Sequence, residues 1–211
     1  ISVAKQRLEE FNVEYIKGDF KDALEGLPLA DGILMDLGVS SYQIDTPERG
    51  FSYRFEGKLD MRMDKDNPLS AEKVINTYSE AELVKIMFDY GEERFSRKIA
   101  ANIVESRKAN PITTTAQLVA IIEKSIPAKF RWSGGHPAKR VFQAIRIEVN
   151  GELEGLRDAI INAVHGLVKG GRMCVITFHS LEDRIVKNTF KYLESDCVCD
   201  KKSPICTCDK V

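Results

Sequence analysis

Hydrophobic and polar positions change their spacing along this chain, and the changes predict two kinds of structure. Val3, Leu8 and Phe11 have the spacing of one helix face. Residues 13–37 then give a short apolar strand, a helix, and a continuous apolar run that ends at Leu37. Residues 172–178 form a second such run. Continuous apolar runs are typical of parallel strands buried on both faces, so the pattern predicts an α/β fold.

The intervening residues predict helices instead of strands. Ser79-x-x-Glu82 and Thr114-x-x-Gln117 are capping boxes, each followed by an apolar helical stripe, and residues 95–109 have one apolar face. We therefore expect an all-helical domain inserted into the sheet domain. The predicted boundaries are 1–68 and 136–192 for the sheet domain, 69–135 for the insertion and 193–211 for a Cys-rich tail.

A further helical pattern leads from the insertion to the second strand. It starts near Pro137, which suits a first helical turn, and continues as an apolar stripe to Leu167. We expect Asn150-Gly151 to kink this helix and Gly170-Gly171 to end it before the strand.

Polar residues follow both predicted strands. Asp36 lies at the end of the first run, and His179 and Ser180 follow the second, with Asp183 in the helix that begins there. The carboxyl ends of parallel strands meet at one edge of a sheet, which is where open α/β sheets bind ligands. These residues are therefore candidates for catalysis. The alternatives are an Asp that caps its own loop and a hydrogen-bonded structural His.

Residues 38–68 have no periodicity and are rich in Gly, Ser, Arg and Asp. A loop of this length inside a compact domain is usually functional. We interpret it as the loop that carries the site.

Composition narrows the class of protein. The 211 residues are 43% hydrophobic, with 31 Lys and Arg against 32 Asp and Glu, which describes a globular chain with material for a core. No apolar run reaches the roughly 18 residues of a membrane span, and no leader opens the chain, so we expect no membrane partner and a cytoplasmic location. The first residue, Ile1, already lies in a helical pattern, from which we expect an N-terminal truncation.

A locally basic stretch stands out against this neutral balance. Residues 128–147 contain no acidic residue, and their cations alternate with Phe130 and Trp132. Basic and aromatic side chains together suit phosphate neutralisation and base stacking, while a solvated helix edge is the alternative. The candidates for RNA binding are Lys129, Arg131, Trp132, His136, Lys139 and Arg140, with the basic helix faces at 97–98 and 107–108 as additional phosphate contacts.

The tail contains four closely spaced thiols. Cys197-x-Cys199 and Cys206-x-Cys208 could hold zinc, although structural zinc sites usually have wider Cys-x₂₋₄-Cys spacing. Reduced free thiols are the favoured alternative, and we expect no metal in the reaction itself.

Six motifs follow one another in order along the chain. They are Asp31-Gly-Ile-Leu-Met-Asp-Leu-Gly-Val-Ser-Ser41, Arg49-Gly-Phe-Ser-Tyr53, Leu59-Asp-Met-Arg-Met-Asp64, Tyr90-Gly-Glu-Glu-Arg-Phe95, Gly135-His-Pro-Ala-Lys-Arg-Val-Phe-Gln-Ala-Ile-Arg146 and Ile176-Thr-Phe-His-Ser-Leu-Glu-Asp-Arg184. Together they resemble one family, the bacterial small-subunit ribosomal RNA cytosine-N4 methyltransferases (RsmH, formerly MraW), and the similarity extends to about Tyr192.

The resemblance implies a Rossmann-like class I methyltransferase that uses S-adenosylmethionine. It implies cofactor contacts from Phe20, Asp36 and Gln43, and a cytosine of small-subunit ribosomal RNA as substrate, with the assembled 30S subunit as the expected partner and a homodimer left open. The family's glycine-rich cofactor loop belongs upstream of Ile1, so an inactive fragment is one interpretation of the chain.

The expected chemistry is methyl transfer to an exocyclic amine. We expect Asp36 and His179 to flank the amine, with Ser180 or Asp183 orienting His179. Two alternatives stay open from the sequence: a DNA amino-methyltransferase with the same crevice, and a non-catalytic RNA-binding or ribosome-assembly module.

Overall fold

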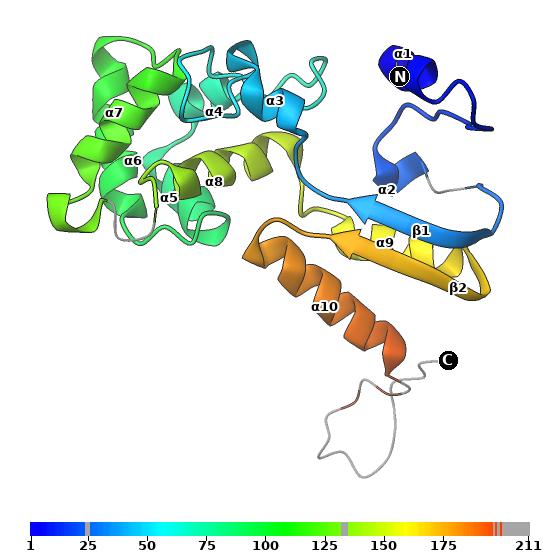
Figure 1. Ribbon diagram of the computed structural model, residues 1–211. Coiled ribbons are helices and arrows are strands. Elements are labelled where there is room, and N and C mark those ends of the chain that lie inside the picture. The colour runs from blue at the N-terminus through cyan, green and yellow to red at the C-terminus, as the bar shows by residue number, and fades with distance from the viewer. Residues whose placement is uncertain (24–25, 132–134, 196, 198, 200–211) are drawn as a thin grey trace. The chain divides into compact units, whose positions relative to one another are not determined.

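The computed structural model describes residues 1–23, 26–131, 135–195, 197 and 199, and the chain divides into two compact units. The sheet unit is formed by residues 1–37 and 153–211, and the helical unit by residues 38–152 (Figure 1). The helical unit contains the whole of the predicted insertion, 69–135, together with the loop that precedes it. The limits of an inserted domain stay a prediction.

The described part of the sheet unit contains one parallel pair of strands. Strand β1 (Ala30–Asp36) lies beside β2 (Leu167–Ile176), with Leu34 opposite Cys174 and Asp36 opposite Ile176. Both strands overlap the apolar runs in the sequence, although β2 begins five residues before the run at 172–178, and this pair confirms an α/β fold with a parallel sheet.

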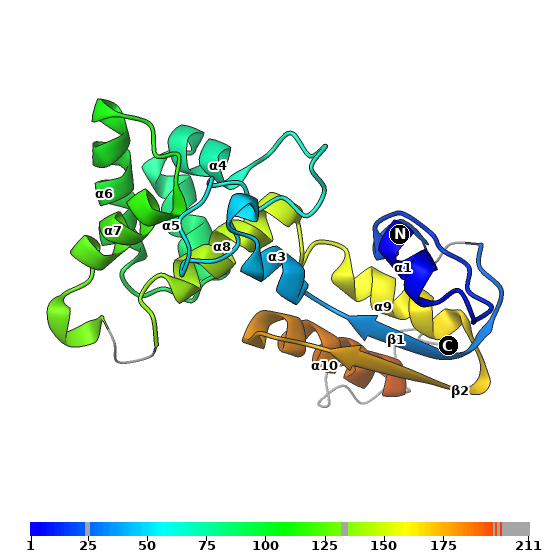
Figure 2. The same ribbon diagram turned by 45° about the horizontal axis from the view of Figure 1, so that its top comes forward.

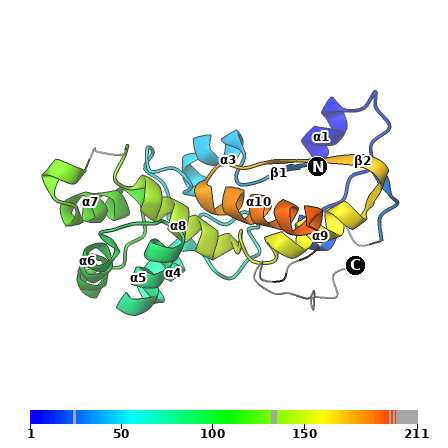
Figure 3. The same ribbon diagram turned by 90° about the horizontal axis from the view of Figure 1, so that it is seen from below.

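One face of this sheet is covered by helices. Helices α9 (Leu156–His165) and α10 (Ser180–Glu194) lie on the same side of the strands (Figure 3). The cluster between them and the sheet consists of Met35, Leu37, Leu156, Ile160, Ala163 and Val186, with Ile33, Met173, Val175, Ile185 and Phe190 packed against it.

The other face of the sheet is exposed among the residues that the structure describes. Its side chains alternate with the buried ones, and Leu34 and Ile176 are 67% and 41% exposed. Cys174 is also exposed on this face. We expected both faces of these strands to be buried. In the described part of the chain, only one face is buried.

The N-terminal segment contains two short helices, α1 (Ser2–Arg7) and α2 (Phe20–Ala23). The strand predicted after Val13 is not formed, since residues 13–17 have neither helix nor strand geometry. Val13 and Ile16 are 38% and 50% exposed. A strand needs a hydrogen-bonded neighbour, and no described strand pairs with this segment.

Short helices form the helical unit (Figure 2). Both predicted capping boxes are confirmed: Ser79 pairs with Glu82 at the start of α5, and Thr114 pairs with Gln117 at the start of α7. The elements are α3 (Ser41–Asp45), the 3₁₀ turn η1 (Pro47–Arg49), α4 (Ala71–Thr77), α5 (Glu80–Asp89), α6 (Ser96–Ala109), α7 (Thr115–Ser125), the 3₁₀ turn η2 (Ala128–Phe130) and α8 (Lys139–Asn150).

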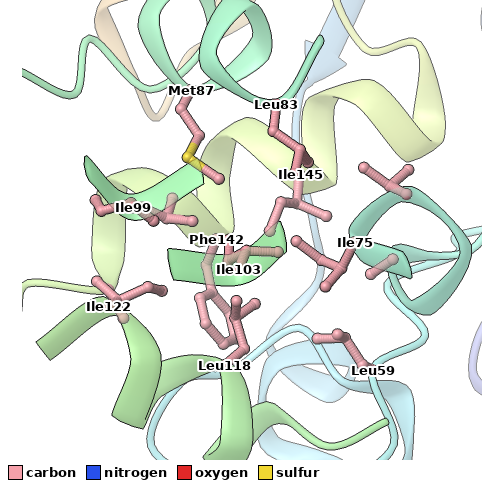
Figure 4. Packing of buried hydrophobic residues seen from close by; sticks show 14 of the residues in the cluster. Leu59, Ile75, Leu83, Met87, Ile99, Ile103, Leu118, Ile122, Phe142 and Ile145 are labelled. Atoms are coloured by element: carbon pink, nitrogen blue, oxygen red, sulfur yellow. The ribbon is translucent and has the colours of Figure 1, made fainter. Parts of the chain in front are cut away.

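The helices of this unit surround one apolar core (Figure 4). Its largest side chains come from every helix between α4 and α8, and also from the loop before α4, which contributes Leu59 and Met61. Figure 4 shows Leu59, Ile75, Leu83, Met87, Ile99, Ile103, Leu118, Ile122, Phe142 and Ile145 directed toward one another. The loop predicted to carry the site is therefore also part of the core.

Glycines end the helices at other places than we expected. Gly151 has φ 58° and is the C-cap of α8, so it ends this helix rather than kinking it. Helix α9 ends at Gly166, and β2 then begins at Leu167. Gly170 and Gly171 consequently lie inside the strand, beside an irregularity in its pairing with β1. A Cβ at position 171 would lie 3.0 Å from the Val168 carbonyl oxygen, which explains the glycine there.

In the part of the chain that the structure describes, no helix has both the length and the apolar character required to cross a membrane.

Candidate functional site

The carboxyl ends of β1 and β2 carry the two residues that the sequence singles out. Asp36 is the last residue of β1, and its side chain belongs to the exposed face of the sheet. The pairing continues one step further, because Leu37 N donates to Ile176 O at 3.1 Å. Since the strands are parallel, Asp36 and the residues after Ile176 lie at the same edge of the sheet, as the arrowheads in Figure 1 show.

His179 is the N-cap of helix α10. Its Nδ1 accepts a hydrogen bond from Glu182 N at 3.4 Å. In return, Oε2 of Glu182 accepts from Phe178 N at 2.8 Å and from His179 N at 3.3 Å. This arrangement is a capping box in which an imidazole replaces the usual hydroxyl.

The remaining imidazole nitrogen also faces Glu182. His179 Nε2 lies 3.1 Å from Glu182 Oε1, at ion-pair distance but without the alignment of a hydrogen bond. The two side chains are 8% and 2% exposed. The imidazole is therefore held in one orientation at the end of the sheet.

Glu182 is the residue whose side chain contacts the imidazole, and the orienting role that we expected from Ser180 or Asp183 stays a prediction. The carboxylate of Asp183 pairs instead with Lys187 Nζ at 2.9 Å on the helix surface, because one helical turn separates the two residues. The sequence contained a signal for Glu182: His179-x-x-Glu182 has the spacing of a capping box, with His in the position of Ser or Thr.

The three candidates for cofactor binding are divided between the two units. Phe20 is the first residue of α2 in the sheet unit and is 37% exposed, and Asp36 belongs to the same unit. Gln43 belongs to the helical unit. Its Oε1 accepts from Ser40 N at 2.8 Å and from Ser40 Oγ at 3.0 Å, so the amide oxygen closes the capping box of α3.

Polar contacts fix the loop before α4 to the end of α8. Asn150 Nδ2 donates to Met61 O at 2.8 Å, and Asn150 Oδ1 accepts from Met63 N at 2.7 Å. Met61 has φ 58°, a left-handed conformation that costs of order 1–3 kcal/mol in a non-glycine residue. Arg49 O accepts from Met61 N at 3.0 Å on the other side. Asn150 and Arg49 thus hold a strained backbone in place.

An ion pair in the same loop shifts two pKa values. Arg62 contacts both carboxylate oxygens of Asp60, with Nε to Oδ1 at 3.0 Å and Nη2 to Oδ2 at 2.8 Å. Burial alone would raise the pKa of Asp60, but the hydrogen bonds and charge of Arg62 outweigh it and hold that pKa below its usual range. The same hydrogen bond raises the pKa of Arg62.

The cations of the basic stretch differ in their hydrogen bonds and in their exposure. Arg131 Nε donates to Ile126 O at 3.0 Å, and Arg140 Nη1 donates to Glu92 O at 2.9 Å. Lys139 is exposed at the start of α8, and Lys129 Nζ lies 4.8 Å from the centre of the Phe130 ring.

Two other candidates for RNA binding lie within the fold. His136 stacks on Tyr53 with ring centres 4.4 Å apart, so two of the motifs meet there. Arg107 donates to the carbonyls of Ile75 and Tyr78, both at 2.6 Å, which commits its guanidinium to the end of α4.

Some predicted residues lie outside the described part of the chain. They are Trp132, Cys206 and Cys208. Cys197 and Cys199 belong to the described residues, and Cys199 N donates to Cys197 Sγ at 3.4 Å. The zinc hypothesis for the tail therefore stays a prediction.

Comparisons with known proteins agree on one family. The profile of the MraW methylase family matches residues 1–211. A protein of Clostridium botulinum (strain Kyoto / Type A2) named Ribosomal RNA small subunit methyltransferase H is 57% identical over 100% of this chain and 70% of its own length. Proteins of the same name from Clostridioides difficile (strain 630) and Fusobacterium nucleatum subsp. nucleatum are 54% and 53% identical over 100% of this chain, and over 70% and 68% of their own lengths.

Proposed function

We propose that this chain, which belongs to the MraW methylase family, transfers a methyl group from S-adenosylmethionine to N4 of a cytosine in small-subunit ribosomal RNA. One observation carries the proposal: the family match spans every residue, and within it Asp36 is an exposed carboxylate at the end of a parallel strand. The names of the relatives favour ribosomal RNA over DNA as the substrate.

The residues around Asp36 fit a cationic, partly apolar methyl donor. The Asp36 carboxylate is exposed, and the side chains of Leu34 and Ile176 on the same face offer apolar surface. S-adenosylmethionine carries positive charge, which suits the carboxylate, and an aromatic base, which suits the apolar surface. When bound, it supplies a methyl group on a sulfonium, ready for attack by a nucleophile.

The protein's part in the reaction is to make the cytosine amine a nucleophile. Its lone pair is delocalised into the ring, so an acceptor must bind an N–H group and turn the lone pair toward the methyl carbon. We assign this role to the Asp36 carboxylate, which can also take the proton that the amine loses when the N–C bond forms. The target base must be unstacked for this, as is usual for enzymes that modify bases.

We assign His179 to positioning. Its imidazole caps α10 and contacts Glu182, so it fixes the end of β2 relative to the helix. The sequence suggested an alternative role, in which the imidazole contacts the amine directly. The two roles predict different activities for variants at position 179.

The experiment compares single-turnover methyl transfer to small ribosomal subunits by matched variants. We expect Asp36→Asn to slow transfer by about 10²-fold or more, because general base catalysis contributes about 10²–10⁴-fold. Asp31→Asn, on the same strand and also exposed, is the control and should react at the wild-type rate. Equal rates for the two variants would contradict the role of Asp36.

A second pair of variants separates the two roles of His179. Asn is a good N-cap and has no imidazole, so His179→Asn should keep most activity if the role is positioning, whereas His179→Ala should lose more. Equal, complete loss in both variants would place the imidazole in the chemistry itself. Mass spectrometry of the product nucleoside identifies the methylated atom.

A further inference from the structure

The motif at residues 90–95 has no role in the site described so far. It forms the turn between α5 and α6, which we call the 90–95 turn. Glu92 has φ 48°, and the turn is closed by Glu92 N donating to Phe88 O at 3.1 Å and Glu93 N donating to Met87 O at 3.0 Å. This left-handed conformation is unfavourable for a non-glycine residue, so the surrounding contacts must hold it.

Helix α8 provides these contacts. Arg140 Nη1 donates to Glu92 O, and Gln143 Nε2 donates to Tyr90 O, both at 2.9 Å. Gly91 allows the close approach, because a Cβ there would lie 2.7 Å from the carbonyl oxygens of Arg140 and Met87. The turn is therefore attached to the start of α8, which carries part of the predicted basic stretch.

The other end of the turn reaches η2. The Glu93 side chain is buried, and its Oε1 accepts from Phe95 N at 2.8 Å. The guanidinium carbon of Arg94 lies 4.4 Å from the centre of the Phe130 ring, and Lys129 Nζ lies 4.8 Å from the same centre. Arg94 and Lys129 are both exposed. Two cations from distant parts of the sequence thus share one aromatic ring.

We infer that Arg94 contacts RNA phosphate together with Lys129, and that the 90–95 turn joins both halves of the basic stretch into one RNA-binding surface. This inference rests on the proposed function, which requires single-stranded or looped RNA near the protein. Two carboxylates belong to the same unit: Glu92 lies in the 90–95 turn, and Glu123 Oε1 lies 3.9 Å from His136 Nε2. Glu93 is turned inward.

Arginine in general can contact phosphate through two parallel hydrogen bonds, and two physical reasons favour Arg94 over an ordinary surface arginine. The first is that its guanidinium lies against a ring, so fewer rotamers are lost when it binds. The backbone that carries it is held by α8 at one end and by Glu93 at the other. A pre-formed cation loses less entropy on binding than a mobile one.

The test measures the affinity of the chain for a single-stranded RNA from the small subunit over a series of salt concentrations. Arg94→Gln should weaken binding several-fold and lower the slope of log affinity against log salt by about 0.7, the value for one phosphate contact on a single strand. Arg94→Lys keeps the charge and should keep the slope. Arg157→Gln is the matched control, because Arg157 lies 4.8 Å from the Tyr192 ring in the sheet unit.

A third variant tests the turn rather than the charge. Gln143→Met removes the hydrogen bond to Tyr90 O and changes no charge, so it should weaken binding with the salt slope unchanged. If Arg94→Gln and Arg157→Gln bind RNA alike with equal slopes, the inference is overturned. Methyl transfer by the wild-type chain is measured separately. If the chain binds RNA but transfers no methyl group, the proposed function alone is contradicted. If it transfers a methyl group and Arg94→Gln binds RNA with unchanged affinity and salt slope, this inference alone is contradicted.

Discussion

The two units of the molecule differ in how much of their apolar surface they bury. Among the described residues, eleven Leu, Ile and Met side chains of the helical unit are less than 2% exposed, whereas the sheet unit has two, Leu156 and Ile160. The sheet has one covered face, while its other face exposes Leu34 and Ile176. Packing energy is therefore concentrated in the helical unit, whereas the candidate catalytic carboxylate lies on the open sheet.

This comparison predicts the largest effect in the helical core. Ile103 is completely buried, and Ile103→Ala should lower the free energy of unfolding by about 2–5 kcal/mol, the usual cost of such a cavity. Leu34→Ala on the open sheet face is the matched control and should change it by less than about 0.5 kcal/mol. Urea unfolding followed by circular dichroism measures both. A large cost for Leu34→Ala would remove the contrast between the units.

A smaller effect should come from the contact that holds the strained loop. Asn150→Ala removes the hydrogen bonds to Met61 O and Met63 N and leaves those groups without this partner, at an expected cost of about 1–3 kcal/mol. Hydrogen exchange should speed up at the Met63 amide. Asn76→Ala is the control, since Asn76 makes the same pair of bonds to Ile112. Unchanged exchange at Met63 in Asn150→Ala would show that the loop is held by other contacts.

The smallest effect concerns pH. The pKa of Asp60 is lower in the folded chain than its ordinary value of 3.8, so its ion pair stabilises the fold above that pH, and the contribution disappears as pH falls through the lowered value. Asp60→Asn should therefore cost less than about 1 kcal/mol at neutral pH and weaken the loss of stability in acid. Unfolding at pH 7 and pH 3 checks this. If the stability of Asp60→Asn falls in acid as steeply as that of wild type, the acid dependence comes from other carboxylates.

Local signals explain what could be predicted from the sequence. The capping boxes of α5 and α7, helix α6 and the strands around Asp36 and Val175 depend on residues within a few positions of each other, and they form where expected. The failures depend on distant partners. The strand after Val13 lacks a described neighbour, and Leu59 is buried by helices that follow it in the chain.

In the candidate site, too, local features could be predicted from the sequence, whereas contacts between distant residues could not. The position of Asp36 at a strand end follows from a local run of apolar residues. The pairing of His179 with Glu182 also had a local signal, but one that uses an unusual capping residue. The approach of Arg94 to Phe130 had none, because 35 intervening residues must fold before the two side chains meet.

The pairing of β1 with β2 also has a consequence for the order of folding. β1 ends at Asp36, and its partner strand begins at Leu167, after the entire helical unit. At about 5–20 residues per second, a ribosome needs on the order of ten seconds to synthesise the residues between them. The contacts of the helical unit are closer in sequence and can form during this interval. The edge that carries Asp36 is then assembled late, after the residues of the helical unit have had time to fold.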